Sequence, residues 1–409
     1  NGFDLVLTNP PFGAKITQSS VLSKFDLGHK WGNKNNEFYQ TKTVYANQNA
    51  EILFIERCLQ LLKEGGRMAI VLPNGNFENP SLDYLRYYIK QKAKVLAIVN
   101  LPQETFIPFG TGVKTSLLFL EKDSKNEEKH YPIFFGRITK LGYQGNKNGT
   151  PIYQKDKYGQ IIKDENKQPI LDEDFSATIE NYKAFLKGKK IETQNSFSIQ
   201  FNELNGRFDY DFYSPENRKL FSNLTNFKTV RLGDICEIVK TKSRKLKDPN
   251  LIVEYVELSD INTHSYEIIN STTSQVHELP SRASYEIEQG DIITAIAGNS
   301  VGTRKHATAL VTEDLAGSIC TNGFRVFRNF KIDSYYLLYY LKSEMFLKQM
   351  FMYRTGAAIP NVSDTDLANI IIHLPEQKTI DDISNKMKKA FELRQASKQQ
   401  IESIELEFA

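Results

Sequence analysis

Apolar runs that alternate with helically spaced segments mark the first 135 residues. Short apolar runs predict buried strands at residues 3–8, 68–72, 95–99 and 115–120. The 3–4 spacing of apolar positions predicts helices at residues 48–63 and 82–92. This alternation predicts an α/β fold with a mostly parallel sheet covered on both faces. Ligands of such sheets lie beyond the carboxyl ends of the strands, and residues 9–12 follow the first strand directly.

The pattern changes twice further along the chain. Residues 140–174 are rich in Gly, Asn, Lys and Gln and poor in large aliphatic residues, which predicts a solvated insertion or a set of mobile hairpins. The segment FDYDFYSP at 208–215 leads into a new unit, and we expect a domain boundary between Asn205 and Phe227.

The second unit is rich in strands before it becomes helical. Candidate strands lie at residues 230–238, 253–258, 291–297 and 324–327, and a helix is predicted at 337–351. The last segment has a 3–4 seam at Ile380, Ile383, Met387, Ala390, Arg394, Ser397, Ile401, Ile404 and Phe408. Arg394 and Ser397 interrupt this seam. It therefore fits either a long helix packed on its own domain or one paired with a partner helix.

Composition narrows the classes of protein. The chain has 409 residues, with 52 Lys and Arg against 49 Asp and Glu, so positive charge for nucleic acid must be clustered locally. Its three cysteines are far apart, which argues against a disulfide scaffold and against a cysteine zinc site. Its six histidines show no metal-ligand spacing, so we expect no metal. No apolar run approaches the ~20 residues that span a bilayer, and we expect a cytoplasmic protein.

The tetrapeptide Asn9-Pro10-Pro11-Phe12 suits methylation of an exocyclic amine. The N6 nitrogen of adenine is a poor nucleophile because its lone pair is delocalised into the ring. The Asn9 side-chain oxygen and the Pro10 carbonyl can accept its two N–H groups and make the lone pair available. The prolines fix these acceptors in advance, and Phe12 can stack on a base flipped from the duplex. The plainer interpretation is a strand that ends at proline, followed by a core phenylalanine.

The hexapeptide TNPPFG at residues 8–13 resembles motif IV of the N6-adenine DNA methyltransferases that modify DNA in type I restriction systems. The resemblance continues through QNAEILFI at 48–55, GGRMAIVLPNG at 65–75, LP at 101–102 with Phe106, and TGVKT at 111–115. It implies that residues 1–145 are the C-terminal half of a methyltransferase domain with a partial Rossmann-like sheet. Residues 146–227 would then be a polar insertion and linker.

The same resemblance implies S-adenosylmethionine as the cofactor. The family binds this cofactor through a Gly-rich loop that lies upstream of its NPPF motif, and no such loop precedes Asn9. We therefore expect the chain to be a C-terminal part of a longer gene product. The cofactor would bind through the part that precedes it, and the chain alone would bind it poorly and be inactive.

The second unit resembles the target-recognition domain of type I specificity subunits. The matching pieces are VRLGDI at 230–235, LSDI at 258–261, GDII at 290–293, YLLYYL at 336–341, GAAIPNV at 356–362 and IIIHLP at 370–375. The resemblance implies an α+β DNA target-recognition domain at 228–375 and a long, coiled-coil-like spacer helix at 376–409. Its fusion to a methyltransferase resembles the single-chain restriction–modification enzymes.

Two basic clusters are candidates for DNA contact. The denser cluster comprises Lys240, Lys242, Arg244, Lys245 and Lys247. The second comprises Arg304 and Lys305, which follow the glycines at 298 and 302. Clustered Lys and Arg on loops can neutralise phosphates and release counterions, although each run is equally typical of a solvated surface.

The sequence thus predicts a site-specific adenine-N6 DNA methyltransferase of a restriction–modification system. Its partners would be double-stranded DNA and, through the C-terminal helix, a second copy or another restriction–modification subunit. The alternative is a sequence-specific DNA-binding fragment without catalysis. A third hypothesis, an RNA or protein methyltransferase, remains open because an NPPF-like turn serves those substrates too.

Overall fold

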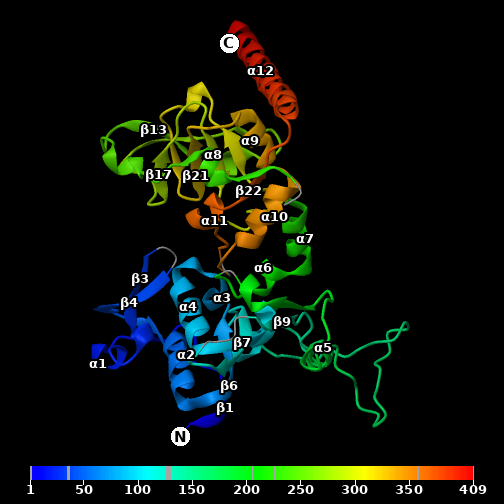
Figure 1. Ribbon diagram of the computed structural model, residues 1–409. Coiled ribbons are helices and arrows are strands. Elements are labelled where there is room, and N and C mark those ends of the chain that lie inside the picture. The colour runs from blue at the N-terminus through cyan, green and yellow to red at the C-terminus, as the bar shows by residue number, and fades with distance from the viewer. Residues whose placement is uncertain are drawn as a thin grey trace. The chain divides into compact units, whose positions relative to one another are not determined.

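The computed structural model in Figure 1 describes residues 2–34, 37–125, 130–204, 206–224, 227–356 and 359–408. The chain divides into two compact units, Asn1–Glu216 and Asn217–Ala409, and each is described by itself. Three residues of the sequence predictions lie outside the described residues, namely Asn205, Ala357 and Ala358.

A six-stranded sheet forms the centre of the first unit, with the order β1-β6-β8-β7-β9-β10. Its strands are β1 (Phe3–Thr8), β6 (Leu62–Pro73), β8 (Thr115–Lys122), β7 (Ala93–Asn100), β9 (Pro132–Arg137) and β10 (Ser196–Gln200). Strand β1 is parallel to β6 and β7 is parallel to β9, whereas β8 is antiparallel to both β6 and β7. The α/β class is confirmed, but the sheet is mixed rather than mostly parallel. The connection after β7 reverses the direction of the chain. Strand β8 therefore runs antiparallel between β6 and β7.

Helices cover the two faces of this sheet. Helices α2 (Ala50–Leu61) and α4 (Asp83–Lys92) pack on the face that carries Ile98 and Phe135. Helix α5 (Phe175–Leu186) packs on the opposite face, against Ala97, Val99 and Phe134. Because alternate residues of a strand point to opposite faces, β7 and β9 contribute to both cores.

Strand β1 lies at an edge of the described sheet, and one of its faces is bare. Phe3, Leu5 and Leu7 are 59%, 57% and 70% exposed. The predicted strand is therefore confirmed, but its predicted burial is wrong for this face, because none of the described helices packs on these three side chains.

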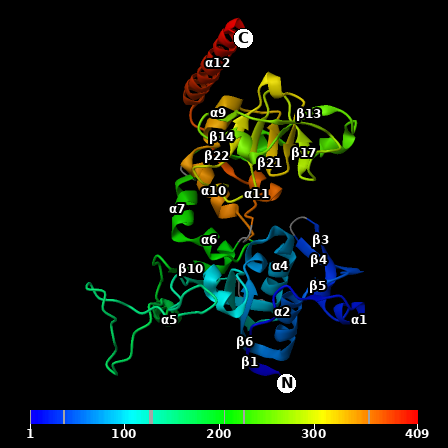
Figure 2. The same ribbon diagram turned by 180° about the vertical axis from the view of Figure 1, so that it is seen from behind.

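Smaller elements complete the first unit. They are β2 (Lys15–Ile16), α1 (Ser19–Leu22), η1 (Asp26–Gly28), β3 (His29–Lys34), β4 (Glu37–Val44), β5 (Gln48–Asn49), α3 (Gly75–Glu78), η2 (Pro80–Leu82), η3 (Gln103–Phe109), η4 (Phe201–Glu203) and α6 (Tyr210–Tyr213). Residues 140–174 form exposed hairpins joined by isolated bridges, and Figures 1 and 2 show them extending away from the sheet beside α5. After β10, Phe208, Tyr210 and Tyr213 return to the core of this unit.

The second unit contains two four-stranded sheets, with the orders β12-β21-β18-β19 and β16-β13-β20-β17. The first sheet consists of β12 (Glu237–Ile238), β21 (Phe324–Arg328), β18 (Ile292–Ala295) and β19 (Thr308–Leu310). The second consists of β16 (Thr272–Gln275), β13 (Ile252–Val256), β20 (Ile319–Thr321) and β17 (Ala283–Glu286). Two further pairs are β11 (Thr229–Arg231) with β22 (Ile371–His373), and β14 (Ile261–Asn262) with β15 (Glu267–Ile268).

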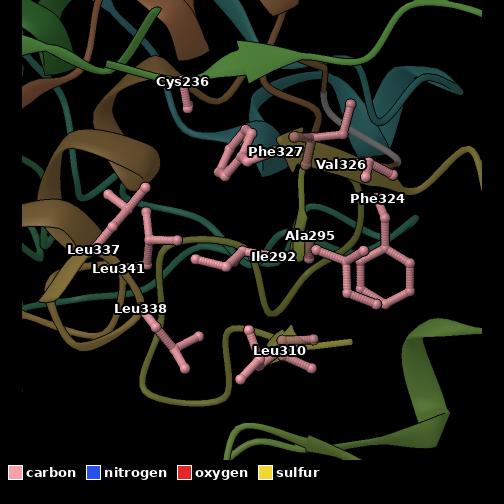
Figure 3. Close-up of a cluster of buried hydrophobic side chains, with 14 of the residues drawn as sticks. Cys236, Ile292, Ala295, Leu310, Phe324, Val326, Phe327, Leu337, Leu338 and Leu341 are labelled. Atoms are coloured by element: carbon pink, nitrogen blue, oxygen red, sulfur yellow. The ribbon is translucent and has the colours of Figure 1, made fainter. Parts of the chain in front are cut away.

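The helices of the second unit are α7 (Pro215–Leu224, which begins in the first unit), α8 (Leu232–Ile235), α9 (Ser334–Tyr340), α10 (Glu344–Tyr353), α11 (Asp364–Ala368) and α12 (Gln377–Phe408). Its short 3-10 turns are η5 (Ser243–Leu246), η6 (Leu258–Asp260) and η7 (Glu313–Leu315). Figure 3 shows the core of this unit, in which Ile292 and Phe327 of the first sheet meet Leu337 and the neighbouring Leu341. The predicted α+β class is confirmed for this unit.

Two predicted elements of the second unit are divided in the structure. Helix α8 interrupts the strand predicted at residues 230–238. The helix predicted at 337–351 is two helices, because the Ser343 hydroxyl caps α10 by accepting the Phe346 N–H at 3.2 Å. Serine at a helix start favours a new N-terminus over a continuous helix.

The long helix α12 packs on its own unit over its first half. Ile380 is buried there, and Ile383 and Met387 pack against the same core. Towards its end Ile401 and Ile404 are 55% and 51% exposed, and the side chain of Phe408 lies outside the described residues. The first half of the seam therefore packs against the core of its own unit. A partner helix that covers the second half of the seam stays a prediction.

Candidate functional site

The Asn9–Phe12 turn directly follows β1, at the carboxyl end of the strand. Pro10 is buried and Phe12 is half-buried, whereas Asn9 is exposed. The Asn9 side chain makes no hydrogen bond to a described residue, so its oxygen remains available as an acceptor. Gly13 closes the turn with φ of +72°, a left-handed conformation that glycine adopts without strain.

Aromatic rings from a second loop meet this turn. Phe106 lies in η3, which follows β7, and its ring meets that of Phe12 edge to face with 6.1 Å between the centroids. The ring of Phe109 lies 6.4 Å from that of Phe106 and is 78% exposed. Two distant segments of the sequence thus bring aromatic rings together at the turn that contains Asn9.

A buried polar network occupies the same edge of the sheet. The Ser116 hydroxyl at the start of β8 donates to the Asn74 side-chain oxygen at 2.9 Å. The Asn100 side chain, at the end of β7, donates to the same hydroxyl at 3.3 Å. Two more buried oxygens, Thr115 Oγ1 and Asn76 Oδ1, have no hydrogen-bond partner among the described residues. In the sequence, Asn74 and Asn100 each follow an apolar run that predicts a strand. The sequence predictions did not assign these two residues to a site.

A buried carboxylate anchors the segment that follows the turn. Glu51, in the first turn of α2, is 3% exposed, and burial raises the pKa of its carboxyl. Hydrogen bonds from the N–H groups of Gly13 and Glu51 and from the Asn49 side chain oppose this rise in pKa. The Ala50 N–H also donates to the Ala14 carbonyl at 2.7 Å. The start of α2 therefore fixes the backbone just after the Asn9–Phe12 turn.

Comparisons with known proteins identify the family of the chain. Residues 1–218, more than half of the chain, match the N-6 DNA Methylase family, and residues 225–403 match the type I restriction modification DNA specificity domain. The chain belongs to the N-6 DNA methylase family and also carries a type I specificity domain.

Similar proteins include methylase subunits of type I restriction enzymes. The EcoEI methylase subunit of Escherichia coli is 29% identical over 126 residues, which cover 31% of this chain and 22% of that protein. The StySPI methylase subunit of Salmonella potsdam is 23% identical over 266 residues, which cover 58% of this chain and 46% of that protein. This N-6 DNA methylase thus spans less than half the length of these relatives.

One solved structure is similar in sequence to part of the chain. The HsdS subunit from Thermoanaerobacter tengcongensis is 28% identical, with a TM-score of 0.34, and the match covers 44% of this chain and 47% of that one.

Methylases of this family imply S-adenosylmethionine as the methyl donor. The described residues do not fit S-adenosylmethionine. None of them forms a glycine-rich turn after a strand that pairs beside β1. The exposed side chains of β1, the edge strand itself, are the apolar Phe3, Leu5 and Leu7.

Some basic residues of the specificity domain contact other residues of the domain, and others are exposed to solvent. Arg244 donates to the Leu279 carbonyl at 2.6 Å, and Lys247 pairs with Glu286 at 2.8 Å. Both hold their own loop in place, whereas Lys240, Lys242 and Lys245 are exposed. Arg304 and Lys305 are also exposed, on the connection between β18 and β19. The structure thus separates the five-residue cluster into two structural cations and three that face solvent.

In the part of the chain that the structure describes, no group of three or more His, Cys, Asp and Glu side chains could hold a metal ion. No helix of the described residues is long and apolar enough to cross a membrane.

Proposed function

We propose that the protein methylates the N6 atom of adenine in DNA, at sites that its second unit selects. The observation that supports this most is the exposed Asn9 amide at the end of β1, in the same turn as Phe12, whose ring meets that of Phe106. An acceptor and an aromatic surface at a strand end suit a flipped base, which needs hydrogen bonds to its edge and stacking on its face.

In the proposed reaction, the Asn9 side-chain oxygen and the Pro10 carbonyl accept the two N–H groups of the adenine amine. The nitrogen becomes more tetrahedral, its lone pair points out of the ring plane, and it forms the new bond to carbon. S-adenosylmethionine, the donor that the family implies, would supply this carbon as the methyl group of its sulfonium centre, with the thioether as the leaving group. The positively charged nitrogen then loses one proton to water, so no strong base is required.

Phe12 and Phe109 are the proposed stacking residues. The Phe106 ring meets the Phe12 ring edge to face, and this contact restricts the orientation of Phe12. Phe109 is the most exposed of the three rings and is able to cover a base from the loop side. Stacking contributes about 1–3 kcal/mol per base and is tolerant of sequence, which suits a catalytic pocket rather than a specificity loop.

We assign a separate role to each of four consecutive segments of the chain. Residues 1–145 carry the catalytic turn, 146–227 form an insertion and linker, 228–375 recognise the DNA target, and 376–409 form a spacer helix. The exposed lysines Lys240, Lys242 and Lys245, together with Arg304 and Lys305, are proposed to contact the DNA backbone. The exposed second half of α12 is the proposed surface for a second copy or another restriction–modification subunit.

The test is methylation by the full gene product and its Asn9→Ala variant. N6-methyladenine is measured by mass spectrometry in DNA from cells that express each protein, with the exposed hairpin variant Asn148→Ala as control. We expect methylation by the wild type and the control and its loss in Asn9→Ala. Absence of N6-methyladenine with the wild type would sink the proposal. Binding of DNA without methylation would then favour a specificity module without catalysis.

A further inference from the structure

The connection between β18 and β19 presents an exposed basic turn. We call residues 298–305 the β18–β19 turn, and its exposed side chains are Asn299, Arg304 and Lys305. The two strands that flank it pair in register, with Thr294 opposite Thr308. The turn is therefore anchored at both ends on the sheet of the second unit.

A fully buried histidine lies beneath this turn. His306 is 0% exposed, and its Nδ1 atom accepts the Gly302 N–H at 3.1 Å. A backbone N–H only donates, so Nδ1 carries no proton and the neutral ring holds its proton on Nε2. That N–H donates to the Thr294 hydroxyl at 2.8 Å, and the Thr294 hydroxyl is 2.8 Å from Thr308 Oγ1. The result is a directed chain of hydrogen bonds from the turn to both strands.

Two cations hold the carbonyls of the same turn. The Lys342 ammonium donates to the His306 carbonyl at 2.7 Å and to the Arg304 carbonyl at 3.4 Å. The Arg354 guanidinium donates to the Val301 carbonyl at 3.1 Å and lies over the Phe351 ring at 3.8 Å. Both cations raise the positive potential under the turn. The Glu344 carboxyl also faces this potential, since Lys348 first and Arg304 last lower its pKa.

Helix α10 packs directly on the centre of the turn. Gly302 has φ of +72°, and a Cβ atom there would lie 2.4 Å from the Phe351 backbone nitrogen. The turn thus has no room to shift towards the helix. Its Gly302 N–H and its Val301 and Arg304 carbonyls are already hydrogen-bonded.

We propose that His306 is a positioning residue for DNA binding: it holds the β18–β19 turn in one conformation so that Arg304 and Lys305 meet phosphate groups without reordering. This rests on the proposed function of the second unit. A turn that is already ordered avoids the entropy cost of fixing its backbone on binding. By contrast, Arg244 and Lys247 of the other basic loop are committed to contacts inside the unit.

The variants separate positioning from folding. His306→Phe keeps a ring against Phe346 but removes both hydrogen bonds, and His306→Asn restores an acceptor near Nδ1 only. Thr294→Val is a milder variant that removes only the hydroxyl beside Nε2. Gln349→Leu is the control, because Gln349 is equally buried and bridges the backbone of Ile371, away from the turn.

The experiment measures binding of the full chain to a fluorescein-labelled random-sequence DNA duplex by anisotropy over a series of salt concentrations. The slope of log Kd against log salt falls by about 0.9 for each phosphate contact that is lost. We expect His306→Phe to lower the slope by about 1–2, as in the double variant Arg304→Ala, Lys305→Ala. Thr294→Val lowers it less, His306→Asn recovers part of it, and Gln349→Leu keeps the wild-type slope.

Two results would overturn the proposal: a wild-type slope in His306→Phe, or an equal loss in Gln349→Leu. If the wild-type chain binds no DNA, the proposed function of the unit fails instead. Amide hydrogen exchange of the peptide 299–305 then still tests the role of His306. Faster exchange in His306→Phe and recovery in His306→Asn support positioning, and unchanged exchange refutes it.

Discussion

The ring of Phe12 meets the ring of Phe106 edge to face, with 6.1 Å between their centroids, although the two residues follow different strands. Phe12 belongs to the turn after β1 and Phe106 to the loop after β7. The contact restricts the orientation of the Phe12 ring in the turn that contains Asn9. The proposed base site is therefore assembled by the sheet, and the sequence motif supplies one part of it.

Removal of the Phe12 ring should weaken capture of the target base. We expect Phe12→Ala to lower the affinity for a flipped base by about 1–3 kcal/mol, roughly 5- to 150-fold, because stacking on the ring is lost. Fluorescence of 2-aminopurine at the target position of a duplex measures this in the full-length protein. Phe54→Ala, which changes an exposed ring on α2, is the control, and an equal loss in both variants would contradict the prediction.

A methyl group at Gly302 should destabilise the second unit strongly. Gly302→Ala combines a left-handed backbone with a Cβ atom 2.4 Å from the Phe351 nitrogen, and we expect a loss of about 2–5 kcal/mol in unfolding free energy. Gly290→Ala has φ of +86° but open space around the new atom, so we expect only about 1–2 kcal/mol. Urea titrations compare the two variants, and equal losses would show that the close approach of α10 has no cost.

The buried His306 should make the second unit sensitive to acid. Burial first, and Lys342 second, lower the pKa of His306 to about 3 from an ordinary value of 6.5. The unfolded chain then binds a proton that the folded chain refuses, so stability is lost as pH falls below 6.5. Between pH 7 and 5 we expect this group to remove about 2 kcal/mol of unfolding free energy. His306→Gln should flatten this dependence in urea titrations at both pH values, and an unchanged pH dependence would refute the assignment.

The buried Glu51 should act in the opposite direction in the first unit. Burial raises the pKa of Glu51 above its ordinary value of 4.5. Its contribution to stability is therefore present below pH 4.5 and is lost as pH rises through the folded-state pKa. We expect the melting temperature of Glu51→Gln, relative to wild type, to increase from pH 5 to pH 8. Glu165→Gln, at an exposed hairpin turn, should show no such trend.

Local sequence patterns predicted most elements near the proposed base site. The apolar runs placed β6, β7 and β8, and the spacing at 48–63 placed α2. The patterns gave wrong elements where a small or polar residue starts a helical turn or caps a new helix. The run at 230–238 contains α8, and the helix at 337–351 breaks at the Ser343 cap. Short apolar runs fit a strand and a buried helical turn equally well, and a hydroxyl cap competes with helix continuation.

The sequence by itself determined the NPPF turn at the end of a strand, the order of elements around it and the resemblance to a methylase family and a specificity domain. Only the tertiary structure decided what meets at the site. It joined Phe106 to Phe12, linked Asn74 and Asn100 through Ser116, and committed Arg244 and Lys247 to their own loop. The reason is physical: propensity and periodicity act over a few neighbouring residues, whereas sheet order and register bring together groups that are far apart in the chain.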